Sequence, residues 1–257
     1  MTFIRATVLG AALLVGGVAS AGAADLYNGR GGSIKDGYAP AGYSSPMGFY
    51  LRGDATYSWN DVGSMFEPPV GQLSDVGTSN SWMFGAGVGY HFTKHVRADI
   101  TYDFGRSHNA HGTELNPNAT FPGVRNFGLK SDVLLANVYY DFGEGHHSRF
   151  SPYLGVGLGV ARNTTSGGVI STCGCTTASF DGASTWSTAA ALMAGVTIQL
   201  RERLSLDAGY RFLYTGDAHT GDITGTGGVG GNPSSADPHV RDLWSHQLRV
   251  GVRYDIH

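Results

Sequence analysis

Apolar residues occupy every second position in eight separate stretches of the chain, and the pattern breaks after each stretch. The apolar series span residues 49–59, 82–92, 96–104, 134–142, 154–160, 190–200, 204–214 and 248–256. A period of two places alternate side chains on opposite faces of a β-strand, so each stretch predicts a strand with one apolar face. None of the eight apolar series contains Asp, Glu, Lys or Arg. Eight such strands in succession favour a β-barrel that crosses a membrane.

The connections between the predicted strands alternate in length. Three of them are short turns, at 93–95, 143–149 and 201–203. The other four are about twenty residues or longer, at 60–81, 105–131, 163–186 and 215–242. Short periplasmic turns and long extracellular loops are typical of outer-membrane barrels, and an even strand number places both chain ends on the periplasmic side. The sequence therefore predicts an all-β fold, an eight-stranded antiparallel up-and-down transmembrane β-barrel.

Periodicity alone does not say which face of the strands points outward, because a soluble lipocalin-like barrel has its apolar face inside. An eight-stranded barrel is only just wide enough to be filled by side chains, and the many aromatic residues of the apolar series would overfill it. Glycine also recurs at every second position on the polar faces of 82–92 and 154–160. We expect these glycines to leave room for long Arg side chains from other strands, so the polar face lines the interior.

Aromatic residues on the apolar faces gather at the ends of the predicted strands. At the long-connection end lie Trp59, Trp82, Phe104 and Tyr214. At the short-turn end lie Phe49, Phe92, Phe142 and Tyr254. Two such bands are typical of the aromatic girdles at the two membrane interfaces. Plain β-propensity also favours aromatic residues in strands, but it does not explain their bias toward strand ends.

The polar faces carry charges of both signs in nearly equal number. The residues that we expect to point into the barrel are Arg52, Arg97, Arg211, Arg249, Arg253, Asp54, Asp99, Asp103, Asp141, Asp207 and Asp255. Charges in so narrow a space must be paired to be tolerated, so we expect an interlocking Arg–Asp network that plugs the barrel. The alternative is a gated ion path, since rings of inward charges also select ions in pores.

The composition agrees with a membrane barrel and argues against other classes of protein. Only 14% of the residues are charged and 40 of the 257 are Gly, whereas soluble proteins carry about 25% charged residues. The mean hydropathy of −0.11 is nonetheless unlike that of a helical membrane protein. The net charge of −3 argues against nucleic acid as a partner.

The first residues have the pattern of a secretory signal peptide. Arg5 is the only charge among the first 24 residues, an apolar stretch covers 6–18, and small residues lead up to Ala23. We expect residues 1–23 to be cleaved, 24–47 to form a periplasmic linker and 48–257 to form the barrel. The alternative is a single membrane anchor, but the apolar run is shorter than the ~20 residues that a span needs.

Cys173 and Cys175 are the two cysteines of the chain, and both lie in the third long connection. They are too few for a disulfide framework, and their pattern does not fit a structural zinc site. Because the periplasm is oxidising, we favour a local disulfide over two free thiols.

We expect no cofactor, no metal site and no enzymatic activity. Ser245 and His246 are the adjacent pair that lies near a strand end, but neighbours on a strand point to opposite faces and cannot pair. The Gly-rich stretches 164–182 and 221–231 lack the strand–loop–helix context of a phosphate site, and we expect them to be flexible extracellular loops. The remaining histidines in loops and turns show no metal-binding spacing, namely His108, His111, His146, His147, His219 and His239.

Several motifs resemble those of the OmpA-like outer-membrane β-barrel superfamily, in particular its small surface-antigen barrels from alphaproteobacteria. They are the Ala-Ala-Asp-Leu that follows the apolar N-terminal stretch, and the sequences WMFGAGVGY at 82–90, PYLGVGLGV at 152–160 and LRVGVRY at 248–254. The resemblance covers the whole chain apart from the long loops. One departure is that such barrels usually end on an aromatic residue, whereas here His257 is last and Tyr254 would take that role.

The resemblance implies an outer-membrane location and a contact with membrane lipid, lipopolysaccharide and the barrel-assembly machinery. It does not select a function, because the superfamily includes structural, adhesive, immune-interaction and weakly channel-forming members. We expect a structural or surface-interaction protein whose long loops contact a ligand or host partner that the sequence does not identify. The alternatives are a small porin-like channel for ions or small solutes and, less favoured, a lipid-modifying barrel enzyme.

Overall fold

The computed structural model describes residues 47–67, 71–114, 123–143, 149–172, 175–221, 223–224 and 239–256. The predicted signal peptide and nearly all of the predicted linker lie outside these ranges, as do Cys173, His146 and His147. A helix able to cross a membrane is absent from the part of the chain that the structure describes.

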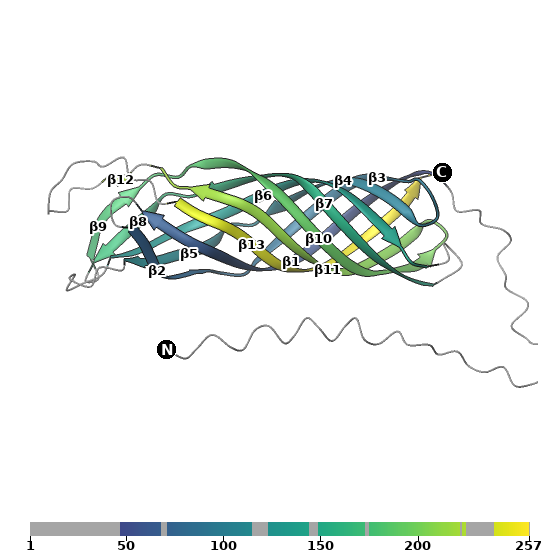
Figure 1. The fold of residues 1–257 in the computed structure, drawn as a ribbon, viewed down its shortest axis with the longest axis horizontal. Helices are drawn as coiled ribbons and strands as arrows, with labels where there is room; N and C mark the ends of the chain where they lie inside the picture. Colours follow the sequence, from purple (N-terminus) through teal and green to yellow (C-terminus); the bar gives the residue numbers. More distant parts are fainter. Residues whose placement is uncertain are drawn as a thin grey trace, which may run out of the picture. The chain divides into compact units, whose positions relative to one another are not determined.

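Eight long strands form a closed antiparallel ring. In chain order they are β1 (Phe49–Glu67), β3 (Ser81–His91), β4 (Val96–Gly105), β6 (Val124–Asp141), β7 (Phe150–Thr165), β10 (Ser184–Arg201), β11 (Leu204–His219) and β13 (His239–Ile256). Around the ring they follow the order β6-β4-β3-β1-β13-β11-β10-β7, and β7 pairs with β6 to close it. The predicted eight-stranded antiparallel barrel is confirmed, and its strands run obliquely around the axis (Figure 1).

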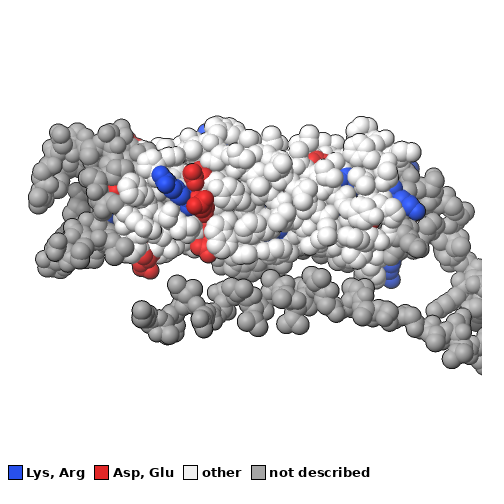
Figure 2. Space-filling view, viewed as in Figure 1, with Lys and Arg blue, Asp and Glu red and all other residues white. Residues whose placement is uncertain are grey.

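The apolar faces of the strands point outward. Along β1, Tyr50, Arg52 and Asp54 are buried in the interior, whereas Phe49 and Leu51 are 59% and 50% exposed on the outer surface. The same alternation runs through the other ring strands, so the predicted orientation of the faces is confirmed. Figure 2 shows one side of the molecule, where charged side chains gather toward the two ends and leave a largely uncharged band between them. That band is the surface that lipid requires.

Inward-facing glycines provide room for the side chains that fill the interior. A Cβ atom at Gly85 would lie directly against the Asp103 carboxylate, and one at Gly157 directly against the Asn137 amide. At Gly87 it would be 3.2 Å from Cγ of Arg52. The room is therefore used by Asp, Asn and Tyr side chains as well as by Arg, which extends the explanation drawn from the sequence.

The long connections are not the loops that the sequence predicted, because much of their length is β-sheet. They contain β2 (Gly71–Thr78), β5 (His108–Glu114), β8 (Gly168–Thr172), β9 (Cys175–Phe180) and β12 (Ile223–Thr224). The ring strands also continue into these connections, as in β6, which begins ten residues before the predicted apolar series at Leu134. Backbone donors and acceptors that leave the membrane pair with neighbouring strands instead of ending in irregular loops. All of these additions lie at the end opposite the β3–β4 turn and the C-terminal end of β13 (Figure 1).

The expectation that 164–182 and 221–231 are flexible loops is wrong for the described residues. The first stretch forms the end of β7 together with β8 and β9, which pair with each other as an antiparallel hairpin. In the second, Ile223–Thr224 form β12 and pair with β9. Residues 225–231 lie outside the described part of the chain.

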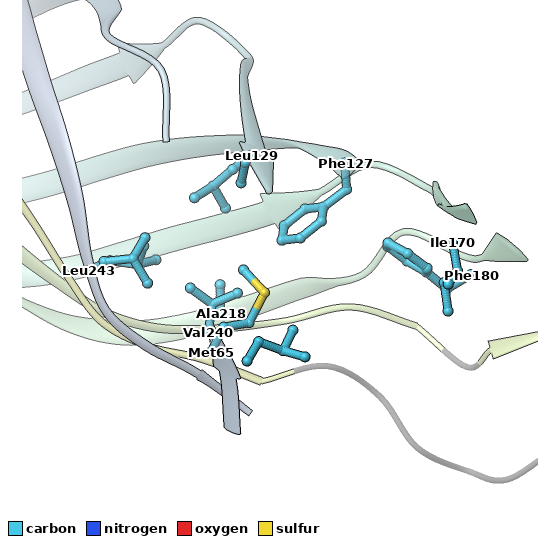
Figure 3. Close-up of a cluster of buried hydrophobic side chains, with 11 residues drawn as sticks. Met65, Phe127, Leu129, Ile170, Phe180, Ala218, Val240 and Leu243 are labelled. Carbon is cyan, nitrogen blue, oxygen red and sulfur yellow. The ribbon is translucent and has the colours of Figure 1, made fainter. Parts of the chain in front are cut away.

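The ends of the ring strands that continue into the long connections, together with β2, β5, β8, β9 and β12, form what we call the extension. The interior of the extension is apolar, whereas the interior of the rest of the barrel holds many charged side chains. Its buried side chains form what we call the upper apolar cluster (Figure 3), made of Val62, Met65, Leu73, Ala110, Phe127, Leu129, Ile170, Phe180, Ala218, Val240 and Leu243. Charged residues such as Asp61, Arg241 and Asp242 face outward at this level. The extension therefore has the arrangement of a soluble barrel, with apolar side chains inside and charged side chains outside. This arrangement suits an outer surface that meets water and not lipid. This reversal explains why the period-two pattern with apolar residues outward stops near Trp59.

Replacing Gly251 by Ala should destabilise the barrel by about 1–3 kcal/mol, because the new Cβ would lie against the Asp54 carboxylate and 3.0 Å from the Gly53 carbonyl oxygen. Gly53→Ala is the matched control, since a Cβ at this outward residue meets the Gly85 carbonyl oxygen at 3.9 Å and nothing else. Urea unfolding of both variants in the same lipid vesicles measures the difference. Equal stability of the two variants would contradict a tightly filled interior.

Candidate functional site

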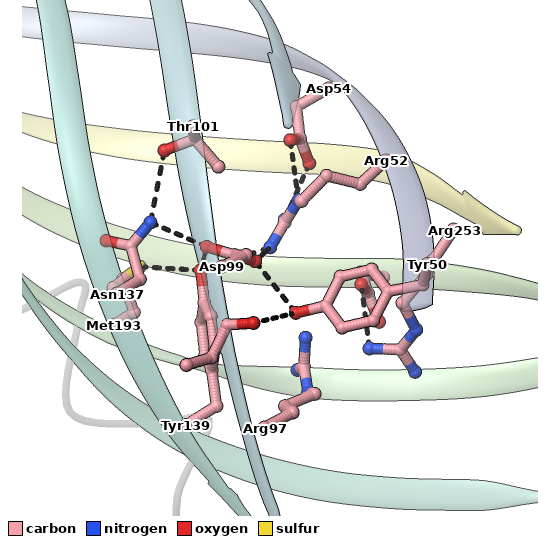
Figure 4. Close-up of polar contacts among 12 residues, drawn as sticks. Tyr50, Arg52, Asp54, Arg97, Asp99, Thr101, Asn137, Tyr139, Met193 and Arg253 are labelled. Carbon is pink, nitrogen blue, oxygen red and sulfur yellow. Dashed lines mark hydrogen bonds and ion pairs between the residues drawn. The ribbon is translucent and has the colours of Figure 1, made fainter. Parts of the chain in front are cut away.

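Arg52 is at the centre of a set of polar side chains in the interior of the barrel, here called the lumen network. Buried apolar side chains such as Val133, Leu135 and Met193 share the interior with it. Arg52 Nε and Nη2 donate to the two carboxylate oxygens of Asp54 at 2.9 and 2.8 Å. Its Nη1 donates to Asp99 Oδ2 at 2.7 Å and to the Tyr139 hydroxyl at 3.0 Å. Arg52 and Asp54 come from β1, Asp99 from β4 and Tyr139 from β6, so these contacts cross the lumen (Figure 4).

Asp99 accepts hydrogen bonds from two other strands, β1 and β6. Besides Arg52 it accepts from the Tyr50 hydroxyl at 3.0 Å and from Asn137 Nδ2 at 2.8 Å. Asn137 also donates to the Thr101 hydroxyl at 3.0 Å. A buried carboxylate is tolerated only when such donors surround it, and Asp99 is 4% exposed.

A second group of ion pairs joins β4, β11 and β13. Arg211 donates from Nη1 to Asp103 Oδ2 and from Nε to Gln247 Oε1, both at 2.6 Å. Arg253 lies 3.5 Å from Asp207, and Asp207 also accepts from the Thr197 hydroxyl at 2.6 Å. These pairs are buried, so each charge is neutralised by a neighbour and not by solvent.

Arg249, on β13, belongs to the Arg52 group. Its Nε lies 3.7 Å from Asp54 Oδ1, and its Nη2 donates to the Tyr139 hydroxyl at 3.4 Å. Asp54 is thus shared between two arginines, one on its own strand and one on the neighbouring β13.

Arg97 occupies the end of the network near the short turns. Its Nε donates to Asp141 Oδ2 at 3.0 Å, and its guanidinium carbon lies 4.2 Å from the ring centre of Tyr139 and 5.0 Å from that of Tyr153. At the same end, Asp255 lies 3.3 Å from Nε2 of His91. Arg97 is completely buried, because two aromatic rings and a carboxylate enclose it.

All eleven charged residues singled out in the sequence lie on inward positions of the ring strands, and the structure brings them together in these pairs. The predicted network of charged residues did not include five further members, of which Thr197, Gln247 and His91 lie on predicted polar faces and Tyr50 and Tyr153 were assigned no face. The alternation of the strands is enough to identify them. Each lies an even number of residues from an inward charge on its own strand, or lies opposite a predicted inward residue on the neighbouring strand. The predicted network was limited to charged Arg and Asp residues and therefore did not include them.

The Glu67–Arg125 pair is a further buried ion pair that the sequence did not indicate. Arg125 Nε and Nη2 donate to the two carboxylate oxygens of Glu67 at 2.7 and 3.0 Å. Arg125 also donates to the Gly123 carbonyl oxygen at 2.7 Å. Both residues belong to connections that the sequence assigned to loops, so neither had a predictable face.

Some buried polar atoms of the described residues have no protein partner. They include both terminal nitrogens of Arg97, one terminal nitrogen each of Arg211 and Arg249, and Asp103 Oδ1. Such atoms are positions where ordered water usually bridges. A cavity of about 30 Å³ touches both Gln247 of the network and Leu129 of the upper apolar cluster. This volume is room for one or two waters at that place.

The eight aromatic residues predicted as girdles all lie on the outer surface. Seven of them are exposed large side chains, and Tyr214 is half-buried with its hydroxyl donating to Asp242 at 3.2 Å. Phe49 packs edge-on against Tyr90 at 5.0 Å between ring centres, and Trp82 packs in the same way against Tyr57 at 5.1 Å. Their role as membrane-interface anchors stays a prediction.

The other candidate residues do not assemble into a reactive site. Ser245 faces the lumen, where it accepts from Gln247 Nε2 at 2.9 Å, whereas His246 faces outward and hydrogen-bonds with the Tyr210 hydroxyl. No group of three or more His, Cys, Asp or Glu suited to a metal ion occurs within the described ranges. Cys175 is the first residue of β9, and its predicted disulfide with Cys173 falls outside the described residues.

Asp99→Ala should lower the free energy of unfolding by about 3–5 kcal/mol, because it leaves the buried Arg52 and Tyr50 donors without their shared acceptor. Asp61→Ala is the control, since Asp61 is exposed and accepts from the neighbouring Val62 amide; a change within about 0.5 kcal/mol is expected there. Denaturant titration in vesicles compares the two. A lumen without paired charges would give similar small losses for both.

His108 on β5 is expected to make the extension less stable in mild acid. Burial lowers the pKa of its imidazole, and the hydrogen bond to the Arg106 carbonyl oxygen opposes this only in part. The pKa of His108 in the folded state lies below the unfolded value of about 6.5. The contribution of His108 to the free energy of unfolding is therefore fully present above pH 6.5 and is lost as the pH falls from there through the folded-state pKa. Melting temperatures at pH 7.5 and 5 should differ more for the natural protein than for His108→Gln; an equal difference would argue against this role.

Comparison with known proteins agrees with the barrel geometry. An uncharacterized protein of Brucella abortus (strain 2308) is 28% identical over 94% of this chain and 95% of its own length. Among solved structures, OprG from Pseudomonas aeruginosa shares the fold with a TM-score of 0.50 and 16% identity, covering 83% of this chain and 98% of that chain. Neisserial surface protein A has a TM-score of 0.46 and 19% identity, covering 81% and 97%. The family model of the outer membrane protein beta-barrel domain matches residues 11–255, so the chain belongs to this family and is a protein of the outer membrane.

Proposed function

We propose that this protein is a plugged outer-membrane barrel with a structural or surface-contact role. The observation that carries the proposal is the lumen network, in which Arg52 and Arg249 from adjacent strands share Asp54 while Arg52 also reaches Asp99 across the interior. A permeating ion has to separate such pairs. Removing one partner from a buried pair costs about 3–5 kcal/mol, so the pairs act as a barrier and not as a path.

The upper apolar cluster supports the same proposal from a second level of the barrel. Met65, Leu129 and Val240 are among its fully buried members, contributed by β1, β6 and β13. Hydrophobic constrictions exclude water and so block ions even without charge. An ion that passed the lumen network would next meet this apolar layer, and the two barriers act in series.

The orientation of the barrel follows from the lengths of its connections. Outer-membrane barrels have short periplasmic turns and long extracellular segments. We therefore place the β3–β4 turn, residues 24–47 and the C-terminus on the periplasmic side, after cleavage of residues 1–23. The extension with β2, β5, β8, β9 and β12 then faces the environment. Its sheet structure supports a contact surface of fixed shape, where a ligand or host partner binds.

Planar-bilayer recording of the purified protein tests the plug. We expect no steady conductance, because the lumen network and the upper apolar cluster both close the interior. The control is Arg241→Gln, which changes an exposed residue outside the lumen and should behave identically. Steady conductance in the nanosiemens range from the natural protein would overturn the proposal and favour the alternative, a small channel for ions or solutes.

A further inference from the structure

Arg162 is an exposed arginine on the outer face of β7. Its one hydrogen bond to a described residue runs from Nη2 to the Ser184 hydroxyl at 3.5 Å, and it forms no ion pair within the described part of the chain. An exposed guanidinium keeps its charge at every physiological pH and presents a planar set of donors. It is therefore available to an anion that approaches the barrel from outside.

The strand register places Arg162 in a row with other interface residues. Arg162 lies opposite Asp132 on β6 and opposite Trp186 on β10, and Trp186 is 68% exposed. The next row toward the extension contains Lys130, whose partner on β7 is Thr164. We call Lys130, Arg162 and Trp186 the β6–β10 patch.

The patch sits where the outer surface changes from apolar to polar. One row closer to the short turns, Leu134 faces Val160 across the β6–β7 pair, and both are exposed apolar side chains. Trp is the residue that most often marks a membrane–water interface. The patch is thus at the height of lipid headgroups, directly above a surface that contacts acyl chains.

The net charge of the patch is positive. Lys130 Nζ lies 2.9 Å from Asp132 Oδ2, and Arg162 lies opposite the same residue, so two positive side chains stand against one carboxylate. Arg binds phosphate through two parallel hydrogen bonds, and Lys adds a point charge next to it. Together the two side chains suit a phosphate monoester that is attached to a lipid.

The opposite side of the barrel provides a contrast in charge. Strands β1 and β13 lie across the ring from β6 and β7, and there Arg241 is accompanied by two outward carboxylates, Asp61 and Asp242; a third, Asp217, lies on the neighbouring strand β11. Asp217 accepts from the Asp242 backbone amide at 3.0 Å, which brings two of these carboxylates close together. An anionic lipid is repelled there, so the charge distribution selects one side of the barrel.

We propose that the β6–β10 patch is a binding site for a phosphorylated glycolipid of the outer leaflet, of the lipid A class. The phosphate binds Arg162 and Lys130, the sugar packs against Trp186, and the acyl chains run along Val160 and Leu134. The site depends on the outward orientation of the extension. It does not depend on the plug, because none of its side chains faces the lumen.

The test uses the folded full-length barrel in a neutral detergent and native mass spectrometry with added bisphosphorylated lipid A. We expect one retained lipid per barrel, and about a tenfold or larger loss of affinity in Arg162→Gln and Lys130→Gln, the size expected for one charge-assisted contact. Arg241→Gln is the matched control, since it removes another exposed arginine, on the acidic side. Chemically dephosphorylated lipid A, added to the natural protein, measures the contribution of the phosphates.

Two results would overturn the site. An equal loss of affinity in Arg241→Gln would mean that lipid A responds to the overall charge of the barrel and not to this patch. Unchanged affinity for the dephosphorylated lipid would mean that the acyl chains alone carry the binding. The conductance measurement on the same variants keeps the two proposals separate, because a loss of lipid binding without any conductance leaves the plug intact.

Discussion

Every other feature of this barrel depends on the need to pair all backbone hydrogen-bonding groups in lipid. An open sheet would leave one row of unpaired groups on each edge strand, so the β6–β7 pairing that closes the ring is obligatory. Closure by eight strands then fixes a narrow interior. Most large aromatic side chains point outward, and the inward positions of β3 and β7 are glycine where Asp103, Asn137 or Tyr139 needs space.

The same constraint explains the change of polarity along the barrel axis. Within the membrane the outer surface must be apolar, so the interior holds the polar residues that alternate with it. Beyond Trp59 the outer surface meets water, and the apolar residues of β1 move inside as Val62 and Met65. Strand pairing continues through this change, because it depends on the backbone and not on which face is apolar. One continuous set of strands therefore contains two cores of opposite character.

The sequence predicted the membrane-spanning half of the structure and failed in the extension for this physical reason. Alternation with the apolar face outward identified all eight ring strands and the inward position of residues such as Arg97 and Asp207, because lipid enforces the pattern. In the extension the apolar face changes sides, and bulges interrupt the period, as between Tyr214 and Gly216. Which charges pair was also beyond the sequence, since the Arg211–Asp103 contact depends on register around half of the ring.

A charged lumen has an advantage that concerns the unfolded chain as well as the folded barrel. In β13 the outward residues from Leu248 to Ile256 are apolar, and the inward Arg249, Arg253 and Asp255 alternate with them. Continuous apolar runs of ~20 residues form membrane-spanning helices. The charged residues of the lumen keep this strand from becoming part of such a run. They also fix the register, because a slip by one residue would turn every charge toward lipid. The lumen network therefore keeps the chain exportable and specifies a single strand pairing, whether or not it adds net stability.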